Sequence, residues 1–186
     1  MRRAALIAVV ALAAAGCGGT TTVTVTQTVT TTRTVTTTSA AGQAADCTGS
    51  DLSATFDVVP NSEGAGNIVY TLTLTNASQS PCSVGGRPQA QLLDAAGAAL
   101  PTHIVALKAG SGGAKVVLQP GGKATADARF SPDVTGTGDH TTGPCQPQAA
   151  TLRVTANGGG TVDATIDPPT SVCEQGQLQF DVLAGA

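Results

Sequence analysis

The sequence is poor in aromatic residues and in side chains that bind soft metals. It has no tryptophan, one tyrosine and three phenylalanines among 186 residues, and only two histidines and one methionine. The single methionine is Met1, which makes a copper carrier built on methionine and histidine a poor candidate. With four aromatic side chains for a core, aliphatic residues and disulfides must supply more of the stability than usual.

Charged residues are also scarce, at 11% of the chain with a formal net charge of −3. The basic residues form no run or stripe, so the chain lacks the electrostatic footprint of a nucleic-acid-binding protein. The sequence also lacks a phosphate-binding loop and a nucleophile-elbow serine. We therefore expect no nucleic-acid partner, no cofactor and no enzymatic activity. The alternative is an envelope hydrolase or metal-dependent enzyme whose loop carboxylates come together on folding.

The first 17 residues have the form of an export signal. Arg2 and Arg3 precede an apolar run, residues 4–15, which is too short to span a bilayer as a permanent helix. The run ends in Ala14-Ala15-Gly16-Cys17, which resembles a bacterial lipobox. The resemblance implies that residues 1–16 are cleaved and that acyl chains on Cys17 anchor the protein to the extracytoplasmic face of the cell membrane. The alternative is an ordinary signal peptide, cut near Ala15.

Residues 17–46 are predicted to be a linker that follows the lipidated cysteine. Residues 20–38 are almost entirely threonine and valine, interrupted by Gln27 and Arg33. Such a tract offers too little apolar surface to offset its ordering entropy. The alternative is a strand, because residues 22–26 alternate between the two residue types and both favour β structure.

Residues 47–186 are predicted to form one all-β domain. Residues 68–75 give the clearest strand, because apolar side chains alternate with threonine. The other predicted strands are residues 52–58, 89–93, 98–107, 114–119, 123–130, 151–155, 161–166 and 177–183. Their number and spacing predict an immunoglobulin-like antiparallel β-sandwich of about eight or nine strands. We expect a monomer whose core contains Phe56, Tyr70, Phe130 and Phe180.

The four cysteines of this domain predict two disulfides in an oxidising compartment. None of them has the close CxxC spacing of a zinc site, so we expect no metal there. If the first two strands form an antiparallel pair, Cys47 and Cys82 lie at the same end. The same argument places Cys145 near Cys173. We predict these two bonds, each stabilising the fold by about 3 to 4 kcal/mol in the chain-entropy model.

Several motifs of the domain resemble those of a known family. They are Cys47 before Asp51-Leu52, Asn76 followed by Ser80-Pro81-Cys82, residues 82–88, Leu118-Gln119-Pro120-Gly121, Cys145 before Leu152-Arg153-Val154, and Cys173 before Leu178. In these features the domain resembles the actinobacterial envelope domain of unknown function numbered 4232. The resemblance implies a secreted or lipid-anchored β-sandwich. It implies no catalytic residue, because the family has no assigned activity.

The candidate binding surface consists of loops, because binding residues commonly lie at the ends of a sandwich. We nominate the end that carries residues 82–88 together with the loop 133–145; the candidate residues are Val84, Gly86, Arg87, Pro88, Asp133, Asp139 and His140. A calcium loop at 133–139 and a metal site shared by His103 and His140 are weaker alternatives, because the ligand patterns are incomplete. We expect a non-enzymatic envelope lipoprotein that binds or organises an envelope protein or glycan; a passive spacer is the remaining alternative.

Overall fold

The computed structural model describes residues 44–109 and 112–186 of the chain. The predicted signal peptide, Cys17 and the threonine-valine tract lie outside these residues, so those predictions are not tested. In the two described ranges, no helix has the length and apolar character needed to cross a membrane.

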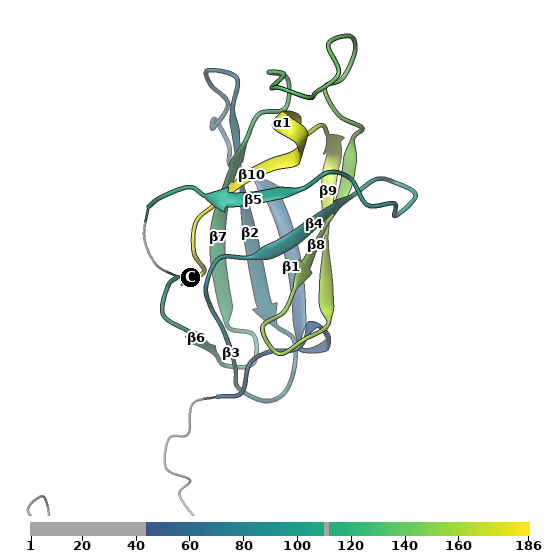
Figure 1. The fold of residues 1–186 in the computed structure, drawn as a ribbon. Helices are drawn as coiled ribbons and strands as arrows, with labels where there is room; N and C mark the ends of the chain where they lie inside the picture. The colour runs from purple at the N-terminus through teal and green to yellow at the C-terminus, as the bar shows by residue number, and fades with distance from the viewer. Residues whose placement is uncertain (1–43, 110–111) are drawn as a thin grey trace, which may run out of the picture. The chain divides into compact units, whose positions relative to one another are not determined.

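The strands form two main sheets that pack face to face (Figure 1). The larger sheet has the order β1-β2-β7-β10-β5, with β11 paired to β7. Its strands are β1 (Leu52–Val58), β2 (Ile68–Asn76), β5 (His103–Ala106), β7 (Lys123–Phe130), β10 (Gln177–Phe180) and β11 (Ala184–Gly185). The smaller sheet has the order β4-β8-β9, with bounds Gln89–Leu93, Ala149–Thr155 and Thr161–Thr170. A separate pair joins β3 (Cys82–Val84) to β6 (Val116–Leu118).

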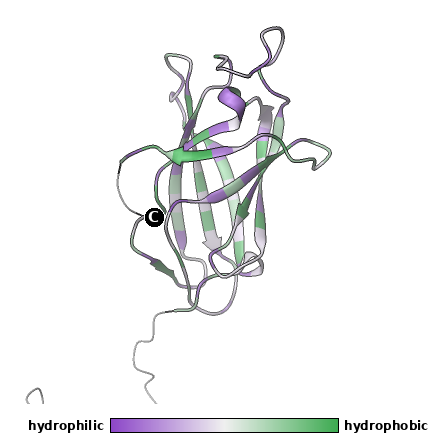
Figure 2. Ribbon diagram, in the orientation of Figure 1, coloured by the Kyte–Doolittle hydropathy of each residue, from purple (hydrophilic) through white to green (hydrophobic). Residues whose placement is uncertain are grey.

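Alternation of side chains determines which face of each strand is buried. In β2, Tyr70, Leu72 and Leu74 are buried and the threonines between them are half-buried on the opposite face. In β7 the buried positions include three alanines, Ala124, Ala126 and Ala128, whose small side chains leave room for the aromatic residues nearby. The alternating colours along the strands in Figure 2 follow the same pattern.

The core lies between the two sheets and contains all four aromatic side chains. Phe56, Tyr70, Phe130 and Phe180 are at most 4% exposed. Ring centroids lie 5.0 Å apart for Phe56 and Tyr70, and 5.2 Å apart for Tyr70 and Phe130, within the range of favourable aromatic pairs. Leu152, Val154, Ala164 and Ile166 cover these rings from the smaller sheet. The predicted aromatic core is confirmed.

Both predicted disulfides are confirmed. Cys47 is bonded to Cys82, with Cα atoms 4.9 Å apart, and Cys145 is bonded to Cys173, with Cα atoms 5.4 Å apart. The all-β sandwich is also confirmed, with two differences. The described residues contain eleven strands, and β5 pairs with β10 in parallel, whereas all strands were expected to be antiparallel.

The two ends of the sandwich differ in what they carry. At the end that we call proximal, residues 44–47 pair with β3, and the amide of Ala186 donates to the carbonyl of Lys123. The end that we call distal carries the loops 59–67 and 131–147 and the short turn α1 (Cys173–Gly176) (Figure 1). Along β7 the two ends lie about 24 Å apart, from seven residue steps of about 3.4 Å. Both termini of the described domain therefore leave from the proximal end.

Candidate functional site

The nominated surface is split between the two ends, so the expectation of a single contiguous patch is wrong. Residues 82–88 follow the proximal end of β2, where Thr75 pairs with Lys123. The loop 131–147 begins after Phe130, which pairs with Ile68 at the distal end. The physical reason is that β6 is a short strand paired locally with β3, and it does not cross the domain. The distal loop and the proximal loop must therefore be considered as separate candidates.

Asp139 is the centre of the distal loop. Its carboxylate accepts four hydrogen bonds: from the backbone N–H of Gly136 (2.8 Å), Glu174 (2.6 Å) and Gln175 (2.8 Å), and from the side-chain amide of Gln146 (2.8 Å). Desolvation raises the pKa of Asp139, but these four hydrogen bonds lower it more strongly, and the resulting pKa is about 2. Asp139 is therefore an ionised carboxylate that joins the loop to α1.

The turn that Asp139 joins has an unusual backbone. Glu174, Gln175 and Gly176 all have positive φ, at 55°, 56° and 79°. Left-handed backbone costs about 1–2 kcal/mol for each non-glycine residue. The carboxylate of Asp139 receives the N–H groups of Glu174 and Gln175, and the disulfide holds the first residue, Cys173, to the loop. These bonds offset the cost of the turn.

The two glycines of the loop have separate structural reasons. A Cβ on Gly136 would lie 2.9 Å from the side chain and 3.1 Å from the Cα atom of Glu174, so Gly136 allows the loop to approach α1 closely. Gly138 has a φ of 91°, a backbone conformation that favours glycine. The Gly-Thr-Gly-Asp sequence, which resembled a weak calcium loop, is therefore explained by packing and backbone conformation. We call residues 136–139 together with α1 and the Cys145–Cys173 disulfide the distal latch.

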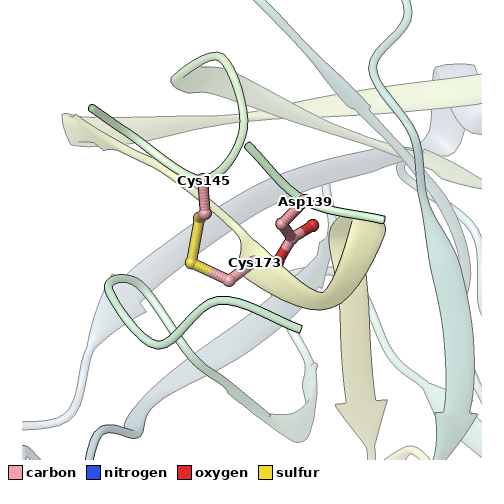
Figure 3. A group of neighbouring side chains, drawn as sticks. All are labelled: Asp139, Cys145 and Cys173. Carbon is pink, nitrogen blue, oxygen red and sulfur yellow. A yellow bond between two sulfur atoms is a disulfide. The ribbon is translucent and has the colours of Figure 1, made fainter. Parts of the chain in front are cut away.

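The distal latch does not fit a metal ion. The carboxylate of Asp139 and the sulfurs of Cys145 and Cys173 lie within 4.8 Å of one another (Figure 3). The two sulfurs are joined in a disulfide and offer no thiolate. Both oxygens of Asp139 already face N–H donors, whose positive ends would repel a cation. The group is a structural cross-link.

The remaining distal candidates do not gather into one group. Asp133 and His140 are exposed, and the backbone N–H of His140 donates to the carbonyl of Cys145 at 3.1 Å. His103 is the exposed first residue of β5. Within the described ranges, none of these three belongs to a group of three or more potential metal ligands. The metal site shared by His103 and His140 thus gains no support from their positions.

Three of the four candidate residues at the proximal end line a small pocket. Val84 is 1% exposed in β3, Pro88 is buried, and Arg87 is half-buried. All three line a pocket with a volume of about 30 Å³. Gly86 is held by its carbonyl, which accepts a hydrogen bond from the amide of Leu183 at 2.9 Å. The structure brings Val84, Arg87 and Pro88 together and leaves Gly86 in a supporting position.

Other residues that shape these ends were not predicted as site residues. Gln146, Glu174 and Gln175 hold Asp139, and the sequence signal for this role is weak, since only the neighbouring glycines indicate it. At the proximal end, Asp46 accepts hydrogen bonds from Lys115 at 2.7 and 2.8 Å and from Ser83 at 2.9 Å. The bond from Lys115, and then the one from Ser83, lower the pKa of Asp46.

Asn76 explains one motif of the predicted family. Its side chain is 1% exposed and donates to the carbonyls of Ser80 (2.8 Å) and Leu118 (3.0 Å), while its oxygen accepts from Ser78. Asn76 therefore shapes the loop that delivers Cys82 to Cys47.

Comparison with known proteins gives the family and nothing finer. No curated protein and no solved structure matches the chain significantly. The family described as "Domain of unknown function (DUF4232)" matches residues 47–183. The match covers both disulfides, the distal latch and the proximal pocket. The chain therefore belongs to the DUF4232 family.

Proposed function

We propose that this protein is a non-enzymatic, lipid-anchored protein of the cell envelope whose distal end binds or organises another envelope component, a protein or a glycan. The observation that carries the proposal is the separation of the two ends. Both termini of the described domain leave from the proximal end, and the distal loops 59–67 and 131–147 lie about 24 Å away. The distal loops thus lie at the end of the domain opposite the one where residues 44–47 enter it.

The stiffness of the distal loop supports a binding role. Residues 131–147 form a long polar loop, and such a loop would lose conformational entropy on binding if it were free. Here the disulfide, the four bonds of Asp139 and a hydrogen bond from Ser171 to the carbonyl of Gln146 (2.8 Å) fix it in advance. A preorganised loop binds at a lower entropic cost.

Site-specific photo-crosslinking in living cells tests the proposal. A photoreactive amino acid replaces Val134 in the full chain, since Val134 is 51% exposed in the distal loop. The matched control carries it at Val117, which is 52% exposed in β6 at the proximal end. We expect one reproducible cross-linked species from position 134, and at least tenfold less of it from position 117.

The same cells test the anchor. We expect the chain in the membrane fraction, and we expect Cys17→Ser to release it, because the acyl chains would no longer form. Equal cross-linking from both positions, or none from either, would contradict a distal binding surface. Retention of the Cys17→Ser chain in the membrane fraction would contradict the lipid anchor.

A further inference from the structure

Arg87 is a half-buried cation without a counterion in the protein. Its Nε donates to the carbonyl of Phe180 at 3.1 Å, which uses one of its five N–H donors. Within the described ranges, no carboxylate lies within 4.0 Å of its guanidinium. The rest of the chain cannot supply one, because residues 1–43 and 110–111 contain no aspartate or glutamate.

The other basic residues of the domain are arranged differently. Lys108, Lys115 and Arg153 each form an ion pair with an aspartate, at 2.6 to 2.8 Å. Lys123 and Arg129 are unpaired but exposed on the outer face of β7, where water solvates them. Arg87 alone among the described cations is both unpaired and half-buried. No buried side-chain nitrogen in the described residues lacks a hydrogen-bond partner, so the other guanidinium nitrogens of Arg87 reach solvent and are open to an external anion.

Arg87 is also one of the lining residues of a small pocket between the two sheets, whose surface is partly apolar and partly polar. Leu52, Leu74 and Val84 form part of its lining and are at most 7% exposed. Gln89 and Thr155, which pair across β4 and β8, are exposed and line the rim. The volume of about 30 Å³ admits a group about the size of a methyl.

We propose that Arg87 and this pocket form a binding site for a small carboxylate whose apolar substituent is the size of a methyl group, such as a chain that ends in alanine. The free guanidinium nitrogens match a carboxylate in a bidentate arrangement. The methyl group fills the apolar floor, and the Thr155 hydroxyl and Gln89 amide at the rim provide further hydrogen bonds. This site is at the proximal end and does not rest on the distal binding surface proposed above.

Nuclear magnetic resonance of the full chain, labelled with ¹⁵N-arginine, tests the site at constant ionic strength. The probe is N-acetylalanine, and the Arg87 Nε–H signal is assigned by its loss in Arg87→Lys. We expect a saturable shift of this signal with a dissociation constant on the order of 1 mM. We expect at least tenfold weaker binding of N-acetylalanine amide, which lacks the charge, and of N-acetylphenylalanine, whose ring exceeds the pocket.

Variants separate a specific site from general charge attraction. Arg87→Gln should weaken binding of N-acetylalanine at least tenfold, and Arg129→Gln, which removes the same charge from the exposed face of β7, should leave it unchanged. If Arg87→Gln does not fold, Ala156→Val takes its place, because it fills the pocket and retains Arg87. No saturable shift, an equal shift with the amide, or an equal effect of Arg129→Gln would overturn the proposal. None of these readouts depends on the lipid anchor or on a distal partner.

Discussion

At the scale of single residues, Asp139 illustrates how a carboxylate in a loop can be structural. In the sequence it follows Gly136 and Gly138 in a polar segment, which could be interpreted as a calcium loop or as a solvated loop. In the structure its oxygens accept only N–H donors. Ionisation of Asp139 thus stabilises the fold and leaves no free lone pair directed at a metal.

The pKa of Asp139 makes this role testable through pH. Its folded pKa is about 2, below the ordinary value of 3.8. Stabilisation by the ionised group is therefore fully present above about pH 4 and is lost as the pH falls from about 4 to 2. We expect Asp139→Asn to lower the free energy of unfolding by about 1–2 kcal/mol at pH 7, measured by urea denaturation. The difference from the unmodified chain should shrink toward pH 2.

Asp133→Asn is the matched control, because Asp133 lies exposed in the same loop. It should leave the free energy of unfolding within about 0.5 kcal/mol at every pH tested. A stability difference for Asp139→Asn that stays constant from pH 7 to pH 2 would show that its ionisation does not hold the latch.

At the scale of elements, α1 could not have been predicted from residue preferences. Glu174 and Gln175 are ordinary helix formers, yet both take left-handed backbone. Tertiary contacts override preference here. Only Gly176, at φ 79°, gives a local sign of the turn.

Gly176 makes the turn sensitive to a single methyl group. An alanine Cβ at this position would overlap the carbonyl of Pro101, in addition to the cost of positive φ. We expect Gly176→Ala to cost about 3 kcal/mol or more, or to prevent folding. Gly143 has a similar φ of 74° with no atom within 4 Å of a Cβ, so Gly143→Ala should cost only about 1 kcal/mol. Thermal unfolding of both variants measures the difference; equal melting temperatures would contradict the overlap.

The strands show which elements the sequence does determine. β1 and β7 have the bounds that alternation predicted, because each strand has one buried and one open face. The strand predicted over residues 98–107 is only His103–Ala106. The residues before it bond to β4 instead: the side-chain amide of Gln91 donates to the carbonyl of Leu100, and the backbone N–H of Leu92 donates to the hydroxyl of Thr102. β3 was predicted as part of a loop, because its three residues are too few to show a period.

At the scale of the whole molecule, the sandwich and its cross-links were predictable and the arrangement of its ends was not. Antiparallel pairing of β1 with β2 places Cys47 beside Cys82, and this follows from strand order alone. Which loops share an end depends on how many strands cross the domain between them. The number of crossing strands depends on whether β6 spans the domain. β6 has only three residues, two valines and a leucine, and so short an apolar run does not show in the sequence how far the strand extends.

The two disulfides should contribute similarly to global stability. They close segments with sequence separations of 35 and 28 residues, for which the chain-entropy model gives about 3.5 to 4 kcal/mol each. Replacing both cysteines of either pair with alanine should therefore lower the free energy of unfolding by about that amount, measured by urea denaturation.

Hydrogen exchange separates the two pairs. Loss of Cys145–Cys173 should also speed exchange of the Glu174 and Gln175 amides, which Asp139 holds. Without the Cys47–Cys82 disulfide, these two amides should exchange no faster than global unfolding of that variant requires. Unchanged exchange at both amides without Cys145–Cys173 would show that the disulfide does not maintain the distal latch.

The bond between Cys47 and Cys82 also determines how the domain resists mechanical force. Tension applied upstream of Ala44 first loads the short pairing of residues 44–46 with β3, which involves few hydrogen bonds. At Cys47 the force passes through the disulfide to Cys82 in β3, and it bypasses β1 and β2, which lie between these two cysteines in the chain. Those two strands lie inside the closed loop and are shielded from the pull. A chain held by its N-terminal side can therefore be stretched without peeling β1 from the sheet.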